Sequence, residues 1–173
     1  GFAGRRKICD LSIRSERNHA EQVIGADSAA RIGMEKLTVG SLDALTEQII
    51  GCAIAVHKAL GPGLLESIYR DCLVIELRAQ GLRVETERQV GLNYRGQPVP
   101  TRLRLDLLVQ MSVVVEVKAV DCIHPIHLAQ VITYLKLAGH SVGLLFNFNS
   151  TSLRVGLRRV IHPDLYASQQ LKR

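Results

Sequence analysis

Residues 104–118 read RLDLLVQMSVVVEVK, and this stretch decides the fold. Two arms rich in Leu and Val flank a short polar break, a pattern that predicts two β-strands joined by a hairpin loop. If Val109 faces Val113 across the loop, counting back along the arms places Asp106 opposite Glu116. Side chains paired in this way lie roughly 5 Å apart, and like charges so placed destabilise a sheet.

The predicted carboxylate pair needs a compensating charge. A buried pair of this kind binds a cation, or one of its members takes up a proton. Lys118 follows Glu116 by two residues, so its side chain points to the same face of the strand. Two acids and a lysine on one face of an apolar hairpin exceed what a core requires. The stretch therefore predicts a metal site with a positioned base or charge stabiliser.

Length and composition are those of one globular domain. The chain has 173 residues, of which 47% are hydrophobic and none is Trp, which predicts an aliphatic core. No apolar run reaches the roughly 20 residues of a membrane span, and no secretory signal pattern occurs. Four widely spaced cysteines favour free thiols in a reducing compartment. We therefore expect a cytoplasmic protein that does not enter a membrane.

The net charge of +6 leaves two interpretations open. It results from 22 basic and 16 acidic residues, a mild excess that suits a polyanionic partner such as nucleic acid. The same excess also serves ordinary solubility. The candidates for contact with nucleic acid are Arg104, Arg154, Arg158, Arg159, Lys172 and Arg173.

The periodicity of apolar residues predicts an α/β domain. Its sheet is expected to be mixed, as in α+β proteins. Its order is α-α-β-β-β-α-β-β, with a central sheet of about five strands flanked by helices. Ser41 is a candidate N-cap for the first helix, and Gly139 ends the third. The expected helices span residues 41–60, 64–80 and 125–138, and the expected strands span 83–94, 99–109, 113–120 and 142–148, with a fifth strand around Leu153, Val155 and Leu157.

The chain divides into three parts. Residues 1–36 lack periodicity and are predicted to be an N-terminal extension. Residues 37–163 carry the strong patterns and are expected to form the domain. Residues 164–173 are expected to be a basic C-terminal tail.

Polar residues on two predicted helices are candidates to reach the site. Glu66 and Tyr69 share one face of the second helix, although an acid in a first turn is also simply favoured by the helix dipole. His127, Gln130 and Tyr134 form a polar stripe on the third helix. This stripe is either the solvated face of the helix or a surface that looks toward the acids, because a βαβ connection lays its helix on the sheet.

Several kinds of chemistry lack support in the sequence. The histidines do not have the spacing of zinc ligands, and His57 is instead expected to cap the end of the first helix. No nucleophile elbow, P-loop or dinucleotide-binding fingerprint occurs. Nucleophilic catalysis by Ser or Cys is therefore not expected.

The sequence GLLESIY at residues 63–69 resembles the motif that names the GxxExxY proteins, a branch of the PD-(D/E)XK nuclease superfamily. The resemblance covers roughly residues 42–162. Leu105 stands where the superfamily signature has its proline. The matching elements are His57, LGPG at residues 60–63, YRG at 94–96, DLL at 106–108, EVK at 116–118, and Gln130 with Tyr134.

The resemblance implies a restriction-endonuclease-like core and a nuclease that uses Mg²⁺ or Mn²⁺. Asp106 and Glu116 would bind the ion together with the backbone carbonyl of Val117, and Glu66 would be an accessory ligand of the ion or of water. Lys118 would orient or activate the attacking water and stabilise charge on the phosphate. Further site residues would be Gln130, in the catalytic set, and Tyr69, Tyr134 and His127 as accessories.

Three functions fit these residues. The first is a Mg²⁺-dependent phosphodiesterase that cuts DNA or RNA. The second is a non-catalytic module on the same fold that binds nucleic acid or protein. The third is a structural or oligomerisation domain in which Asp106 pairs with Arg104 or Lys118, and Glu116 pairs with Lys118. The oligomeric state stays open, a dimer included.

Overall fold

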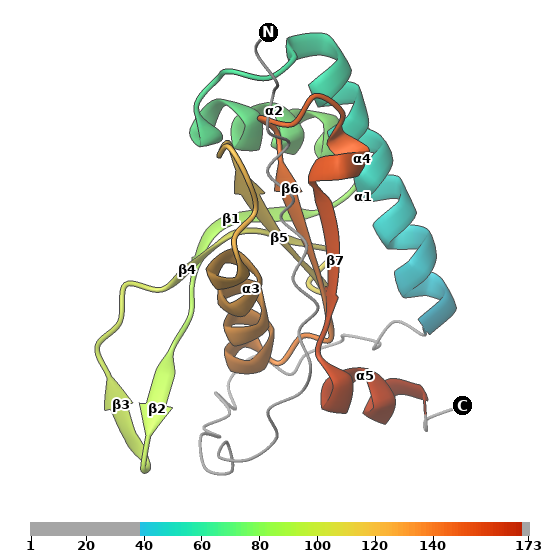
Figure 1. Ribbon diagram of the computed structural model, residues 1–173. Coiled ribbons are helices and arrows are strands. Elements are labelled where there is room, and N and C mark those ends of the chain that lie inside the picture. The colour runs from blue at the N-terminus through green and yellow to red at the C-terminus, as the bar shows by residue number, and fades with distance from the viewer. Residues whose placement is uncertain (1–38, 171–173) are drawn as a thin grey trace, which may run out of the picture.

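A five-stranded mixed sheet forms the centre of the protein (Figure 1). The computed structural model describes residues 39–170, with side chains for residues 40–167. The parallel neighbours β5 and β6 make the sheet mixed, because the other neighbouring strands are antiparallel. In spatial order the strands are β1 (Val84–Gln89), β4 (Arg104–Val109), β5 (Val113–Lys118), β6 (Val142–Asn147) and β7 (Leu157–Ile161).

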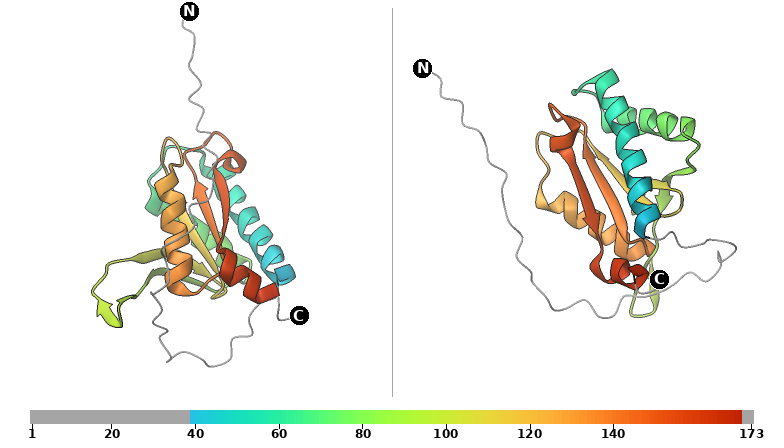
Figure 2. Two further views of the ribbon diagram at one scale, coloured as in Figure 1. Left: turned by 60° about the horizontal axis from the view of Figure 1, so that its bottom comes forward. Right: turned by 90° about the vertical axis from the view of Figure 1, so that its right-hand side faces the viewer.

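Helices cover both faces of this sheet. Helices α1 (Val39–Leu60) and α2 (Glu66–Ala79) pack on one face, and α3 (Pro125–Ala138) packs on the other (Figure 2). The predicted third helix is confirmed at both ends, since Gly139 terminates it in the left-handed conformation with φ 72° and ψ 28°. The predicted mixed sheet flanked by helices is thus confirmed.

The first helix differs from its prediction at both ends. Its apolar stripe is buried from Leu42 to Val56, whereas Leu60 is 39% exposed. Ser41 lies inside the helix, which begins two residues earlier, so the predicted N-cap is wrong. His57 does not cap the helix either, because its Nε2 lies 2.9 Å from the carbonyl oxygen of Ser150.

Strand β6 is buried on both faces, as its continuous apolar run predicts. Helix α3 is the crossover between the parallel strands β5 and β6 and lies close above β6. Gly143 permits this approach, since a Cβ at this position would lie 2.7 Å from Cγ1 of Val131. The close packing therefore holds the second half of α3 against the start of β6.

The predicted strands at residues 83–94 and 99–109 are each interrupted. The N–H of Val90 still donates to the carbonyl of Leu103 at 2.8 Å, as a continuation of the β1–β4 ladder. Beyond this bond the register shifts by two residues, because Gly91 and Pro100 intervene and proline has no N–H to donate. The outer parts form a separate hairpin of β2 (Leu92–Tyr94) and β3 (Gln97–Val99), which projects from the body (Figure 1).

The predicted fifth strand begins too early. Residues Leu153–Gly156 form the short helix α4, and the strand β7 starts only at Leu157. The backbone of Gly156 lies so close to Ser150 and the carbonyl of Asn147 that a Cβ there would clash. Helix α5 (Pro163–Gln170) follows and takes up most of the segment predicted as a tail.

Some predictions fall on residues that the structure does not describe. The predicted extension at residues 1–36 lies outside the described residues, as do Cys9, Lys172 and Arg173. Within residues 39–170, no helix combines the length and the apolar character that crossing a membrane requires. Cys52 and Cys72 are free thiols, as expected.

Candidate functional site

The β4–β5 hairpin is regular at its loop and irregular at its open end. Val109 pairs with Val113, as predicted, and two further pairs continue the antiparallel ladder. Beyond these pairs the N–H of Val117 donates to Oδ2 of Asp106 at 2.9 Å. A carboxylate therefore takes the place of a strand carbonyl at this end of the hairpin.

The backbone around Asp106 departs from regular strand geometry. Leu105 packs in the core beneath α3, whereas Leu107 packs in the core beneath α1 and α2. A regular strand would place residues two apart on the same face. On β1, Glu87 interrupts the ladder opposite Asp106 with a φ of 48°, a conformation that costs roughly 1–3 kcal/mol and that concentrates at functional sites. The irregularity explains how Asp106 reaches sideways to β5.

Glu116 is the most deeply buried acid of the site. Its side chain is only 2% exposed. Oε1 lies 2.6 Å from Nζ of Lys118 and accepts a hydrogen bond from Nε2 of Gln130 at 2.9 Å. Oε2 is buried and has no hydrogen-bond partner among the described residues. A buried polar atom without a partner is costly, so this oxygen has capacity for a cation or a proton.

The electrostatics of the carboxylate pair agree with this capacity. Burial, together with the charge of Asp106, raises the pKa of Glu116 to about 7 although Lys118 opposes the shift. Burial also raises the pKa of Asp106, although the hydrogen bond from the N–H of Val117 and the charges of Lys118 and Arg70 act to lower it. The ionised pair is therefore short of positive charge.

Lys118 remains protonated at neutral pH. Burial alone would lower the pKa of Lys118, but its hydrogen bond to Glu116 and the surrounding carboxylates raise the pKa above the ordinary value. The ammonium group can therefore donate hydrogen bonds and charge. In this state it cannot accept a proton from water.

Glu66 brings a third carboxylate to the same place. It is the first residue of α2, and its Oε1 accepts a hydrogen bond from the N–H of Ala119 at 3.1 Å. Ala119 directly follows Lys118 at the end of β5. The negative charge of Glu66 contributes to the raised pKa of both Asp106 and Glu116. The side chain thus points toward the carboxylates.

Tyr69 holds the loop that precedes Glu66. Its hydroxyl donates to the carbonyl of Gly61 at 2.6 Å and accepts from the N–H of Leu64 at 3.1 Å. Its ring is fully buried and stacks on Phe148 with centroids 4.6 Å apart. Tyr69 therefore supports the loop and the start of α2, and its hydroxyl is engaged there.

The polar stripe on α3 faces the sheet. Gln130 contacts Glu116, and its Nε2 also lies 3.0 Å from the hydroxyl of Tyr134, which is only 6% exposed. Nδ1 of His127 accepts the N–H of His124 at 3.1 Å at the start of the helix. Burial and the nearby charge of Lys118 lower the pKa of His127, so the imidazole is neutral at pH 7.

Arg70 is a site residue that the sequence reasoning missed. Its guanidinium lies 3.6 Å from Oδ1 of Asp106 and 3.9 Å from Oε1 of Glu87. A signal existed, because Arg70 follows Glu66 by four residues and so shares its helix face.

Asn147, also missed, is 3% exposed and bonds both backbone groups of Val120, which fixes the chain just beyond β5.

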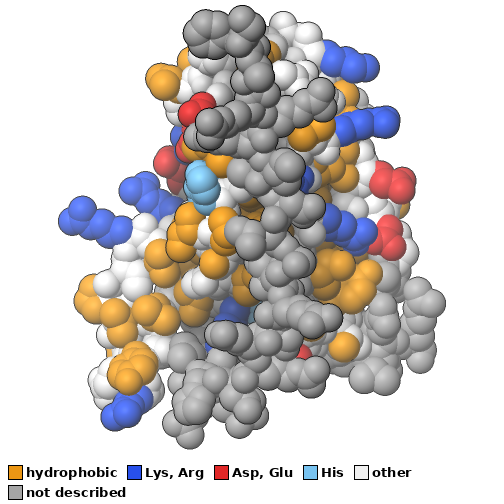
Figure 3. All heavy atoms as spheres, in the orientation of Figure 1, with side chains coloured by type: hydrophobic (Ala, Val, Ile, Leu, Met, Phe, Trp, Pro, Cys, Tyr) orange, Lys and Arg blue, Asp and Glu red, His pale blue; other side chains and the backbone are white. Residues whose placement is uncertain are grey.

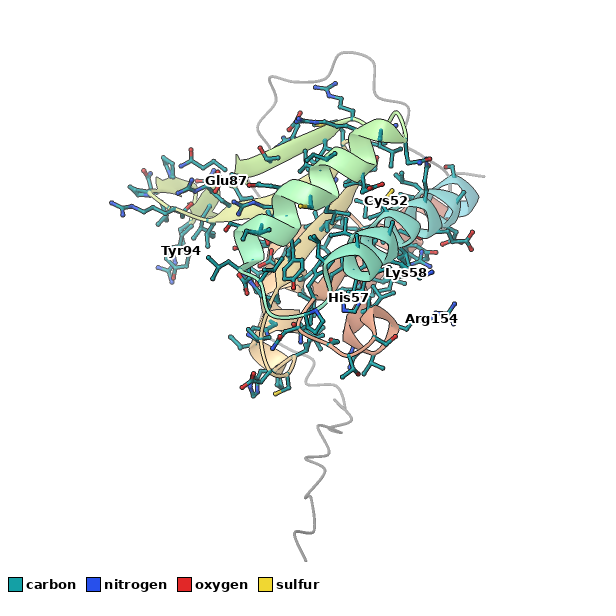
Figure 4. All side chains as sticks on the ribbon, turned by 90° about the horizontal axis from the view of Figure 1, so that it is seen from above. Cys52, His57, Lys58, Glu87, Tyr94 and Arg154 are labelled. Carbon is teal, nitrogen blue, oxygen red and sulfur yellow. The ribbon has the colours of Figure 1, made fainter. Side chains whose placement is uncertain are left out.

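The predicted arginine contacts separate into two groups. Arg104 lies two residues before Asp106 and pairs with Glu87 at 3.9 Å. The others lie on α4 and β7, at the opposite edge of the sheet from β1, and Figure 4 shows Arg154 across the molecule from Glu87. Arg158 donates to nearby backbone carbonyls, and Arg159 pairs with Asp43 of α1. These three arginines are not brought to the carboxylates.

The donor set fits a hard cation, although residues 39–170 contain no group of three or more His, Cys, Asp or Glu arranged to hold a metal. The fit rests on Oε2 of Glu116, an oxygen without a partner beside a second carboxylate. The N–H of Val117 faces Asp106, and in a strand the carbonyl of the same residue faces the same side. Oxygen donors of this kind suit Mg²⁺ or Mn²⁺.

Comparison with protein families agrees with this geometry. A family model described as the PD-(D/E)XK nuclease superfamily matches residues 43–160, from α1 to β7. The chain belongs to the PD-(D/E)XK nuclease superfamily. No curated protein and no solved structure matches it. The predicted superfamily and its restriction-endonuclease-like core are therefore confirmed, whereas the GxxExxY branch stays a prediction.

Proposed function

We propose that this superfamily member is a nuclease that hydrolyses phosphodiester bonds of DNA or RNA and requires Mg²⁺ or Mn²⁺. The observation that carries the proposal is the buried Oε2 of Glu116, which has no partner although Asp106 lies beside it. A carboxylate pair in this state is stabilised by a divalent cation. A binding surface or a core has no need for such a pair.

Asp106 and Glu116 would hold the ion, with the carbonyl of Val117 as a further oxygen ligand. When bound there, the ion supplies an activated water and offsets charge on the phosphoryl oxygens. Mg²⁺ usually takes only one or two carboxylates and keeps several waters. Glu66 therefore suits an accessory role through one of these waters.

Lys118 would donate to the attacking water or to a phosphate oxygen. Its raised pKa keeps the ammonium charged, so stabilising negative charge suits it better than accepting a proton. Gln130 would hold Oε1 of Glu116 in position through its 2.9 Å hydrogen bond. Arg70, 3.6 Å from Asp106, would hold that carboxylate from the other side of the sheet.

The motif GLLESIY supports a finer proposal, membership of the GxxExxY branch. Gly63 has a φ of 107°, which favours glycine, while Glu66 reaches β5 and Tyr69 holds the loop. We expect Glu66→Gln to lower cleavage with little loss of stability, and Tyr69→Phe to lower stability first. Thermal unfolding and cleavage rates of the two variants separate these roles, and the reverse pattern contradicts them.

A binding module without catalysis is the second candidate. The ion pairs of Lys118 with Glu116 and of Arg70 with Asp106 partly neutralise the acids without a metal. The double variant Asp106→Asn, Glu116→Gln tests in EDTA whether the acids form a metal site or structural ion pairs. Stability that holds or rises agrees with a metal site, because a repulsion is removed, whereas stability that falls indicates structural ion pairs.

Cleavage of DNA and RNA by the purified chain tests the proposal. We expect cleavage with Mg²⁺ or Mn²⁺, none in EDTA, and none by Asp106→Asn or Lys118→Ala. Asp164→Asn, an exposed change on α5, is the matched control and should cut as the wild type does. If both site variants cleave at the wild-type rate, the proposal is wrong.

A further inference from the structure

Residues 88–104, called the arm below, are locally basic. They include four arginines and no acidic residue, in a chain whose overall excess is mild. Three of the arginines are exposed, namely Arg95, Arg102 and Arg104. Figure 3 shows Lys and Arg side chains that stand out from the left edge of the molecule, the side that carries β1, β4 and the arm in Figure 1. Arg88 and Arg104 form ion pairs with Glu85 and Glu87, which lie just before the arm. Arg95 and Arg102 add exposed positive charge that suits a polyanion.

A groove lined by residues with charged or amide side chains lies at the base of the arm. It has a volume of about 410 Å³ and is lined by Glu87, Gln89, Arg102 and Arg104. Arg70 connects the groove wall with the site, since its guanidinium lies 3.9 Å from Glu87 and 3.6 Å from Asp106. Its charged lining suits a phosphate backbone better than an apolar ligand.

The tip of the arm is a tight turn that presents an aromatic and a basic side chain. Arg95 and Gly96 have φ values of 49° and 77°, the left-handed conformations that a two-residue hairpin turn requires. The guanidinium of Arg95 lies 5.5 Å from the ring of Tyr94, which is 56% exposed. The YRG element at residues 94–96 therefore forms the exposed tip of the arm.

We propose that the arm binds double-stranded DNA next to the bond that is cut, with its arginines on the phosphates and its tip in the major groove. The major groove of B-form DNA admits a two-stranded β-ribbon, whereas that of A-form RNA is too narrow for side chains to read. Binding of single strands relies on a series of stacking aromatics, and the arm has only Tyr94.

The length of the arm fits one turn of duplex. Gly96 at the tip is ten residues from Asp106, which spans at most about 35 Å. One helical turn of B-form DNA is about 34 Å long. The arm therefore reaches DNA within about one turn of the cut. The cutting rests on the proposed nuclease function, whereas the binding by the arm can be measured without it.

The test is DNA binding by the full chain in EDTA, where cleavage does not interfere. Fluorescence anisotropy is recorded with a labelled duplex of about 30 base pairs, about three helical turns, and with matched single-stranded DNA and duplex RNA. The salt concentration is varied over about 50 to 200 mM. Two double variants remove the contacts: Arg102→Ala with Arg104→Ala at the groove, and Tyr94→Ala with Arg95→Ala at the tip.

A matched control removes the same charge elsewhere. Lys58→Ala with Arg78→Ala deletes two exposed cations outside the arm, in the last turns of α1 and α2. Figure 4 shows Lys58 across the molecule from Glu87 and Tyr94. We expect the groove variant to lower the salt slope of log K by roughly 2 and the control to leave it unchanged. The tip variant should weaken duplex binding by about tenfold and remove the preference for duplex DNA over duplex RNA.

Each other outcome has a definite meaning. Wild-type protein that prefers single-stranded DNA or duplex RNA overturns the proposed partner. Arm variants that stay folded by circular dichroism and bind as the control does overturn the arm. A loss of binding that accompanies a shift from dimer to monomer in gel filtration assigns the arm to a second copy of the chain and also overturns it. DNA binding through the arm without any cleavage contradicts only the proposed function.

Discussion

The two ends of the β4–β5 hairpin are built from the same two strands and behave in opposite ways. At the loop end, from Leu107 to Val115, the pairing is regular and every apolar side chain of the strands is fully buried. At the open end the ladder stops, Asp106 enters between the strands, and Glu116 is buried with one oxygen unpartnered. The loop end stabilises the fold, and the open end positions charges that destabilise it unless a cation compensates them.

Residues that stabilise the fold and residues expected to act in cleavage therefore lie only a few positions apart on the same two strands. A regular apolar ladder can hold a strained residue next to it, because the energy cost of the strain is small compared with the energy gained by burying the apolar side chains. The distorted backbone at Glu87 and the sideways Asp106 both lie at the open end. We therefore expect substitutions at the two ends to affect different measurements.

The largest expected effect is on cleavage at the open end. Lys118→Ala should lower the rate by about 10³-fold or more, equivalent to about 4 kcal/mol, because it removes the positive charge nearest to Glu116. Removing this ion-pair partner of the buried Glu116 also lowers the stability without metal, so the rate is compared per folded molecule. A single-turnover assay with Mn²⁺ measures the rate, and Lys58→Ala on α1 is the control. A folded Lys118→Ala with the wild-type rate would remove the distinction between the two ends.

The next effect is on stability at the loop end. Leu108→Ala should lower the free energy of unfolding by about 2–5 kcal/mol, because Leu108 is fully buried beneath α3. Urea denaturation measures the loss. The protein that remains folded should cut at an unchanged rate per molecule. A large loss of cleavage per folded molecule would show that the loop end also contributes to the chemistry.

A third effect is the pH dependence of stability without metal. The folded-state pKa of Glu116, about 7, lies above its ordinary value of 4.5, so the folded protein holds a proton that the unfolded chain has released. Stability should therefore fall as the pH rises from 4.5 to 7, by about 3 kcal/mol in total. Glu116→Gln should flatten this dependence, while Glu47→Gln on the exposed face of α1 should keep it. Urea titrations in EDTA across this pH range measure the free energy of unfolding. If it falls as steeply in Glu116→Gln as in the wild type, Glu116 is not the source of the pH dependence.

The smallest effect concerns Gln130. Gln130→Ala removes a hydrogen bond to the ionised Glu116, which costs about 1 kcal/mol and raises the pKa of Glu116 further. The acidic limb of the pH–rate profile should therefore move to higher pH, with about threefold less activity at the pH where the wild type is half active. Gln80→Ala, an exposed change after α2, should leave the profile in place. An unshifted limb would mean that Gln130 does not act on Glu116.

The sequence predicted the regular parts of the molecule. The register of Val109 with Val113 follows from the length of the loop, and the bounds of α3 follow from Pro125 and Gly139. The candidate carboxylates could be found in the same way, since alternation along a strand places Glu116 and Lys118 on one face. These inferences need only local periodicity.

The parts that could not be predicted depend on contacts far apart in the chain. Alternation at residues 153–157 suggested a strand, but the close approach of Gly156 to Asn147 makes a helical turn there. The sideways rotation of Asp106 accompanies the unusual backbone of Glu87 on the neighbouring strand, for which the sequence carries no signal. The ion pair of Arg70 with Asp106 also joins two elements whose contact only the fold creates.

Calorimetric titration of the full chain with Mn²⁺ and Mg²⁺ tests the central claim most directly, namely that Asp106 and Glu116 form a cation site. We predict binding by the wild type at pH 8, weaker binding with release of a proton at pH 6, and no binding by Glu116→Gln. Glu47→Gln should bind as the wild type does. Equal binding by wild type and Glu116→Gln, or no binding by either, would contradict the account.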